Sequence, residues 1–168
     1  IVLLMAALAW LAAGGAHAGF YGNYVSATYA RPGANIALST AGPVIAGPAL
    51  EFPSIGATNI SVDFTDTGFR IAFPATWNLL TGSPVFDGIY IDVQQGPGMP
   101  FNGTTGASIA ASSIAGVGNN RLTPGATRIY VNLAGLGSIA AGNYIDVAVP
   151  FPPTAPYGCS VIANPTAP

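Results

Sequence analysis

The feature that constrains this chain most is a strand-type alternation of apolar and polar residues. Residues 59–64 (NISVDF) carry a large apolar side chain at every second position, and residues 69–73 (FRIAF) do the same. Because successive side chains of a strand point to opposite faces, this period of two predicts strands with one buried face and one wet face. The short loop between the two runs ends in glycine and predicts a hairpin.

The alternation returns further along the chain, and turn signals separate the runs. It recurs at residues 89–93, 128–133 and 145–149, with weaker strand candidates at 21–29, 35–39 and 108–114. Glycine and proline predict turns at several places, among them Gly42-Pro43 and Thr123-Pro124-Gly125. Residues 78–80 predict a single helical turn, and no internal repeat is expected. About eight short strands with frequent turns predict an all-β fold, an antiparallel β-sandwich of jelly-roll or immunoglobulin-like type.

The N-terminal segment has the pattern of a signal peptide. Residues 1–13 (IVLLMAALAWLAA) form an unbroken apolar run, which Gly14-Gly15 and Ala16-His17-Ala18 follow. Ala16 and Ala18 place small residues at positions −3 and −1, so we expect cleavage before Gly19. The run is shorter than the roughly 20 apolar residues that span a bilayer, so no stable membrane span is predicted. We expect a signal-peptide helix at 1–18, a sandwich domain at 19–149 and a proline-rich tail at 150–168.

The charge composition excludes some partners. Only 6% of the residues are charged, where about 25% is usual, and the cations are four scattered arginines. Nucleic acid binding needs clustered basic residues, so it is excluded. A polar surface with so little charge repels its own copies only weakly, which leaves self-association open.

The side chains that most enzymes use are missing from the expected mature chain. The one histidine of the full sequence, His17, lies in the predicted signal peptide, and the sequence has no lysine. Serine and cysteine nucleophiles need an imidazole base, Schiff bases need lysine, and zinc or copper sites need His and Cys. The single cysteine, Cys159, is expected to be an inert tail thiol or an intermolecular disulfide. No catalytic, metal or cofactor site is predicted, and we expect a non-enzymatic protein.

Two groups of carboxylates are candidate sites, and a simpler interpretation is favoured for each. Asp63 and Asp92 are candidates for a glycosidase pair, and their position on outward strand faces favours solvated charges instead. Asp63 and Asp66, with the carbonyl of Thr65 or Thr67, are candidates for a calcium site, and an ordinary aspartate turn is favoured.

Aromatic residues supply the candidates for ligand contact. Trp77, Tyr90 and Tyr130 could present rings to a glycan, and the last two fall on the polar faces of their strands. For Trp77, core packing is favoured. Exposed rings indicate a binding site only where they form a contiguous patch.

Several segments resemble PEP-CTERM-associated bacterial exported proteins of the β-sandwich-like type. They are residues 86–89 (FDGI), 129–136 (IYVNLAGL) and 142–147 (GNYIDV), with 47–52 and 60–73 fitting the same pattern. The resemblance implies a bacterial envelope or extracellular-matrix setting that is often linked to exopolysaccharide, and it transfers no catalytic residue. Residues 150–168 contain no Pro-Glu-Pro sorting motif, so the resemblance does not extend to that tail.

These observations lead to one functional hypothesis with two alternatives. We expect a non-enzymatic surface or extracellular-matrix protein, exported to the cell surface or medium of a bacterium, with polysaccharide or its own copies as partners. The alternatives are a glycan-binding β-sandwich module and a self-assembling filament or coat subunit.

Overall fold

The structure is a computed structural model that describes residues 19–31, 39–79, 86–96 and 103–151. These residues form eleven strands and one 3-10 turn, at Asn119–Arg121. The expected signal-peptide helix and most of the expected tail lie outside the described residues. So do Ala16, Ala18 and Cys159, whereas Gly19 is the first described residue.

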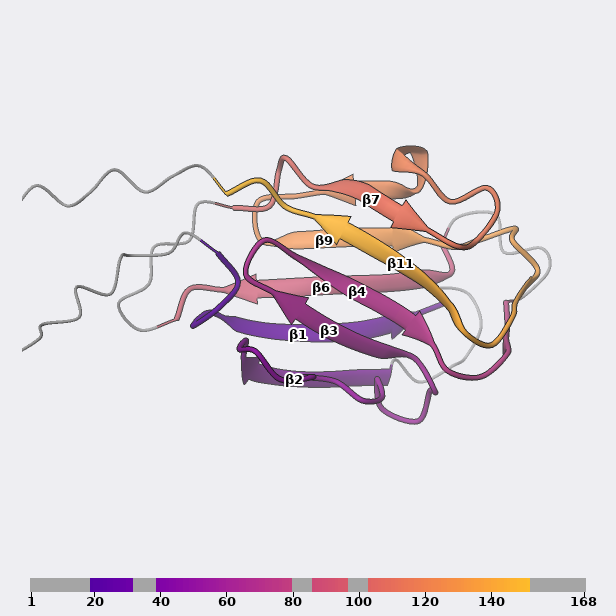
Figure 1. The fold of residues 1–168 in the computed structure, drawn as a ribbon, viewed down its shortest axis with the longest axis horizontal. Coiled ribbons are helices and arrows are strands. Elements are labelled where there is room, and N and C mark those ends of the chain that lie inside the picture. The colour runs from indigo at the N-terminus through magenta and orange to yellow at the C-terminus, as the bar shows by residue number, and fades with distance from the viewer. Residues whose placement is uncertain (1–18, 32–38, 80–85, 97–102, 152–168) are drawn as a thin grey trace, which may run out of the picture.

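Two antiparallel sheets make up most of the domain. Sheet A has five strands in the order β2 (Ser39–Ile45), β1 (Tyr24–Ala30), β6 (Gly88–Gln94), β9 (Arg128–Asn132) and β8 (Leu122–Pro124). Sheet B has four strands in the order β3 (Ser61–Thr65), β4 (Gly68–Phe73), β11 (Asn143–Ala148) and β7 (Ser108–Ser112). A small ladder joins β5 (Trp77–Asn78) to β10 (Ser138–Ile139). Figure 1 shows the two large sheets face to face, with sheet B toward the viewer. The fold is thus the antiparallel β-sandwich that the alternation predicts.

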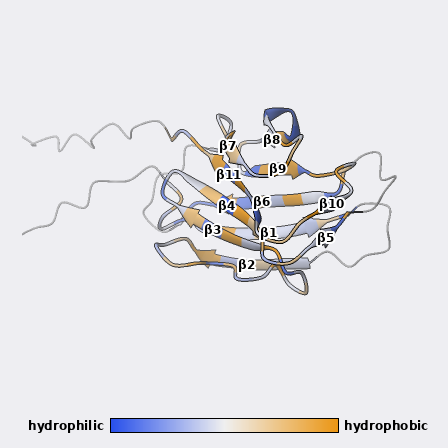
Figure 2. Ribbon diagram, turned by 45° about the vertical axis from the view of Figure 1, so that its right-hand side comes forward, coloured by the Kyte–Doolittle hydropathy of each residue, from blue (hydrophilic) through white to orange (hydrophobic). Residues whose placement is uncertain are grey.

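The core lies between the sheets. Inward side chains from both sheets form one cluster, and those of β4 and β6 are at most 2% exposed: Phe69, Ile71, Phe73, Ile89, Ile91 and Val93. Their chain neighbours point outward, so apolar and polar bands follow one another along the strands (Figure 2). This alternation places Tyr90, Asp92 and Arg70 on outer faces of the sandwich.

The predicted hairpin is confirmed. Strands β3 and β4 pair with Thr65 opposite Gly68, so the connecting loop is Asp66-Thr67. A Cβ at Gly68 would lie 2.2 Å from the carbonyl oxygen of Val147 on β11. Glycine is therefore required where the hairpin meets the third strand of sheet B.

Three predictions about local structure need correction. Gly42-Pro43 lies inside β2, where a turn was expected, and the turn expected at Thr123-Pro124-Gly125 begins only at Gly125, because Thr123 and Pro124 belong to β8. Both strands are edges of sheet A, and an edge strand tolerates proline because its outward N–H groups need no partner. Trp77 and Asn78 form strand β5 where a helical turn was expected. The described residues contain more strands than the eight or so expected, and the additional ones are β5, β8 and β10. Runs of two or three residues are too short to show alternation.

The far end of the described domain returns to the core. The ring of Phe151 packs edge-to-face against Phe20 with centroids 5.1 Å apart, and Phe20 is fully buried. Across the described ranges, no helix has the length and apolar character needed to cross a membrane.

Candidate functional site

Three aromatic rings meet on the outer face of sheet A. The register of β6 and β9 places Tyr90 directly opposite Tyr130, and their ring centroids are 5.9 Å apart. Phe86 meets Tyr130 edge-to-face at 6.0 Å. Tyr130 is 36% exposed, and the other two rings are half-buried. We call Phe86, Tyr90 and Tyr130 the aromatic surface. It contains two of the three aromatic residues that the sequence singled out.

An arginine–aspartate pair lies next to these rings. Arg128 is opposite Asp92 in the same strand pair and donates to both of its carboxylate oxygens, with Nη2 2.8 Å from Oδ2. The guanidinium carbon lies 4.3 Å from the centroid of the Tyr90 ring and 5.8 Å from that of Tyr130. The hydrogen bonds to Asp92 raise the pKa of Arg128 further above its usual value. The pair is therefore fixed in position and keeps both polar partners beside the rings.

Hydroxyl groups extend the site across the sheet. Following the strand pairings, one row runs across all five strands in the order Thr40, Thr28, Tyr90, Tyr130 and Thr123, in which Thr28 is buried at 2% exposure. The Oγ1 of Thr28 donates to that of Thr40 at 3.1 Å. In the next row, Ser26 is opposite Asp92. The exposed threonine hydroxyls of the first row are thus those of Thr40 and Thr123, at its two ends.

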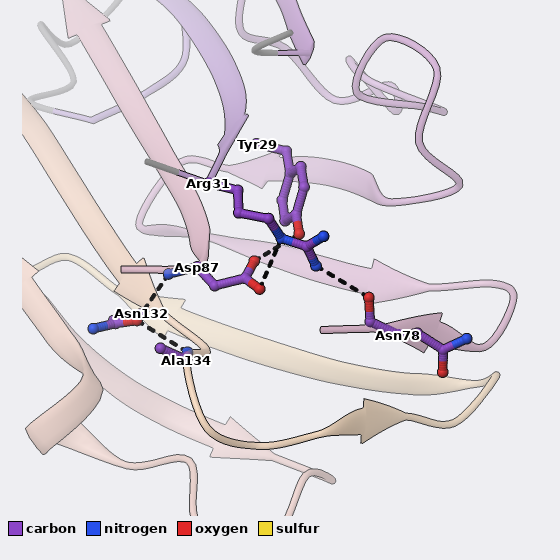
Figure 3. Close-up of polar contacts among 6 residues, drawn as sticks. All are labelled: Tyr29, Arg31, Asn78, Asp87, Asn132 and Ala134. Atoms are coloured by element: carbon purple, nitrogen blue, oxygen red, sulfur yellow. Dashed lines mark hydrogen bonds and ion pairs between the residues drawn. The ribbon is translucent and has the colours of Figure 1, made fainter. Parts of the chain in front are cut away.

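A buried polar network fixes the start of β6, next to the aromatic surface (Figure 3). Asp87 is fully buried and accepts hydrogen bonds from Tyr29 Oη at 2.6 Å and from Arg31 Nε at 3.0 Å. Arg31 also donates through Nη2 to the carbonyl of Asn78 at 3.1 Å. Burial first, and the bond to Asp87 second, raise the pKa of Tyr29 to about 12, while Trp77 and Arg31 act in the opposite direction.

The same network connects β6 to the end of β9. The amide side chain of Asn132 accepts through Oδ1 from the backbone N–H of Asp87 at 3.3 Å and of Ala134 at 3.0 Å. The N–H of Leu133 donates to the carbonyl of Asp87 at 2.8 Å. Because Asp87 follows Phe86 and precedes β6, these bonds fix the register that sets Tyr90 opposite Tyr130.

Trp77 does not belong to the aromatic surface. Its ring packs edge-to-face against Tyr29, with centroids 5.1 Å apart, and it is half-buried against the core. Tyr29 is only 3% exposed. Core packing, which the sequence favours for Trp77, is what the structure has.

The structure does not bring the candidate carboxylates together. Asp63 lies on β3 in sheet B and Asp92 on β6 in sheet A, both outward, so the two are on opposite faces of the sandwich. In the suggested calcium loop, the carbonyl of Asp66 accepts from Phe20 N–H, and that of Thr67 accepts from Val149 N–H. No group of three or more potential metal-ligating side chains occurs within the described part of the chain.

The outer face of sheet A therefore suits a ligand that combines an apolar face with hydrogen-bonding groups. The exposed ring of Tyr130 offers packing area, Arg128 offers donors, and Asp92 offers acceptors. The opposite charges of Arg128 and Asp92 cancel, so the site does not select a strongly charged ligand. Comparison of the chain with models of protein families, with curated proteins and with solved structures finds no match.

Proposed function

We propose that this chain is a non-enzymatic, exported surface or matrix protein that binds polysaccharide through the aromatic surface of sheet A. The observation that carries the proposal is the exposed ring of Tyr130 beside the Arg128–Asp92 pair. A pyranose ring has an apolar C–H face and a rim of hydroxyls. The aromatic ring can pack against the C–H face, and the ion pair can bond to the hydroxyls as donor and acceptor.

The balance of charge favours a neutral polysaccharide. A polyanion would need several unpaired cations, and Arg128 is already paired with Asp92. The exposed hydroxyls of Thr40 and Thr123 add uncharged groups at the two ends of the same row. A ligand that crosses the strands would follow this row over the whole width of sheet A.

The proposed location rests on the sequence. The signal-peptide pattern of residues 1–18 supports export, and the resemblance to PEP-CTERM-associated proteins supports a bacterial matrix setting. The absence of histidine and lysine from residues 19–168 supports a binding role over a catalytic one.

Self-assembly is the second candidate, because an apolar edge favours it. On and beyond edge strand β2, Ile45 is 56% exposed and Leu50 is 51% exposed. Both line a cavity of about 210 Å³ with Val44, Pro48 and Glu51. An exposed edge strand can pair with another chain. Light scattering over a concentration series, with and without reductant, tests this candidate: growth into large species supports it, and a monomer throughout rejects it.

Affinity electrophoresis tests the main proposal. The purified protein is run through gels that contain hydroxyethylcellulose, xyloglucan, galactomannan or alginate, beside Tyr130→Ala and a control, Tyr24→Ala. Tyr24 is a half-buried tyrosine at the far end of β1 in the same sheet. We expect at least one neutral polysaccharide to retard the protein and the control but not Tyr130→Ala. The binding site is wrong if Tyr130→Ala is retarded equally, and polysaccharide binding is wrong if no gel retards the protein. Cleavage of the polysaccharide would contradict a non-enzymatic role.

A further inference from the structure

A four-residue sequence occurs in both large sheets. Tyr-Ile-Asp-Val stands at residues 90–93 on β6 and at residues 144–147 on β11. On the neighbouring strand each copy faces an Arg-Ile pair, at residues 128–129 on β9 and at 70–71 on β4. The register is the same, since Asp92 is opposite Arg128 and Asp146 is opposite Arg70. The recurrence is confined to this four-residue sequence and the Arg-Ile pair that it faces.

The side chains of the second copy repeat the geometry of the first. Arg70 donates to both carboxylate oxygens of Asp146, at 2.7 and 2.8 Å. Its guanidinium carbon lies 4.5 Å from the centroid of the Tyr144 ring. Ile145 and Val147 point into the core, so Tyr144 and Asp146 point outward from sheet B. We call each copy, together with the Arg-Ile pair that it faces, a unit. The two units lie on opposite outer faces of the sandwich, and sheet B is the one toward the viewer in Figure 1.

The second unit differs from the first in shape. The residue opposite Tyr144 is Ala72, whereas the residue opposite Tyr90 is Tyr130. On the other side of β4, strand β3 places Asp63 opposite Arg70. A cavity of about 290 Å³ opens here, lined by Asp63, Thr65, Phe69, Arg70 and Asp146. Sheet B thus has a hollow where sheet A has a projecting ring.

We propose that this cavity is a second saccharide site, so that one domain bridges two polysaccharide chains on opposite faces. The inference rests on the proposed function, because it assigns the same chemistry to the second copy of the unit. Arg70 donates to sugar hydroxyls, Asp63 and Asp146 accept from them, and the Tyr144 ring lies beside the pair. Two carboxylates surround one guanidinium, so the site takes neutral sugar residues and rejects uronic acids.

Bridging would give the protein a structural role in a matrix. Two sites on one rigid domain hold two chains at a fixed separation, and many such domains join chains into a network. Once one site of a domain has bound, the other site meets the network at a high effective concentration of polysaccharide. Modest affinity at each site therefore suffices.

Amide NMR shifts separate the two sites. The ¹⁵N-labelled protein is titrated with cellohexaose, with mannohexaose and with trigalacturonic acid. We expect a neutral hexasaccharide to shift amides of β4 and β11 as well as those of β6 and β9, and the acid to leave β4 and β11 unmoved. Shifts confined to β6 and β9 overturn the second site and leave the proposed function standing. Shifts confined to β4 and β11 overturn binding at the aromatic surface, and with it the bridging, and leave only the site on sheet B standing. No shifts with either hexasaccharide overturn both sites. Shifts of β4 and β11 with the acid overturn the stated selectivity.

Two variants assign the shifts to side chains. Arg70→Ala is expected to remove the response of β4 and β11 and to keep that of β6 and β9, whereas Arg128→Ala does the opposite. Asp63→Asn leaves the Arg70–Asp146 pair intact and is the gentler test if Arg70→Ala does not fold; it is expected to weaken the response of sheet B alone. Equal responses in Asp63→Asn and the unsubstituted protein overturn the role of the cavity.

Discussion

The guanidinium of Arg128 lies 4.3 Å from the centre of the Tyr90 ring, on the outer face of sheet A. Asp92 holds the guanidinium there through both of its carboxylate oxygens. One face of Tyr90 is therefore covered, and Tyr130 is the ring left for a ligand. This division of roles connects the strand register to the proposed function, because it needs Asp92 opposite Arg128 and Tyr90 opposite Tyr130 at once.

Replacing Arg128 tests the division of roles. We expect Arg128→Ala to weaken polysaccharide binding about tenfold, equivalent to ~1.4 kcal/mol. The free energy of unfolding should change by less than about 1 kcal/mol, because the pair is partly exposed. Arg128→Lys keeps the charge but loses the planar fork, and it should also bind weakly. Full binding by Arg128→Lys in calorimetric titration would show that charge alone suffices.

Breaking the buried pair of Arg31 and Asp87 is expected to destabilise the protein far more than breaking an exposed pair, because it leaves a buried charge unpaired. Asp87→Asn leaves Arg31 without its anionic partner at 8% exposure, and we expect a loss of about 3 kcal/mol in the free energy of unfolding. The control, Asp146→Asn, breaks an exposed pair and should cost less than about 1 kcal/mol. Urea denaturation of both variants measures the difference, and equal losses would contradict a structural role for Asp87.

The raised pKa of Tyr29 predicts a loss of stability in alkali. The pKa of the Tyr29 phenol is about 12 in the folded state, against 10.0 for an ordinary tyrosine. Its contribution is therefore complete below pH 10 and is lost as the pH rises from 10 to 12. Tyr29→Phe should be less stable at neutral pH, and the difference from the unsubstituted protein should shrink over that interval. Denaturation at several pH values measures the free energy of unfolding of both proteins. A difference between them that stays constant as the pH rises would contradict this assignment.

The N-terminal residue of the exported protein is a further prediction. We expect a start at Gly19, because Ala16 and Ala18 fit the cleavage pattern and Phe20 is fully buried. Asn23 Nδ2 donates to the Gly19 carbonyl at 2.6 Å, so Gly19 is itself held by the domain. Intact-mass measurement of the exported protein checks the start, and Ala18→Arg should block processing. A start beyond Phe20, or processing of Ala18→Arg at the usual place, would contradict the prediction.

The central strands are predictable from sequence because each buries one face. Strands such as β4 and β6 alternate through Ile71 and Ile91, and their local pattern is enough. The edge strands of sheet A, β2 and β8, were missed because Pro43 and Pro124 are typical of turns, and a strand that pairs on one side only accepts them. Local pattern cannot show which strands pair, and pairing decides the rest.

The candidate site depends on that pairing. The outward orientation of Tyr90 and Tyr130 follows from alternation, but their contact follows from the β6–β9 register. That register rests on Asp87 and Asn132, which are 45 residues apart in sequence. The Arg70–Asp146 pair spans 76 residues and was equally hidden. The sequence held one signal of these pairs, because Tyr-Ile-Asp-Val occurs twice. Each copy lies on a strand whose neighbour carries an arginine opposite the aspartate.

Calorimetric titration of the protein, Tyr130→Ala and Tyr130→Phe with the neutral polysaccharide that retards it tests the central claim most directly. We expect Tyr130→Ala to bind about tenfold more weakly, ~1.4 kcal/mol, because it loses the exposed ring. Tyr130→Phe keeps the ring and should bind within about threefold of the unsubstituted protein. Equal affinity of Tyr130→Ala and the unsubstituted protein, with both folded, would contradict binding at the aromatic surface of sheet A.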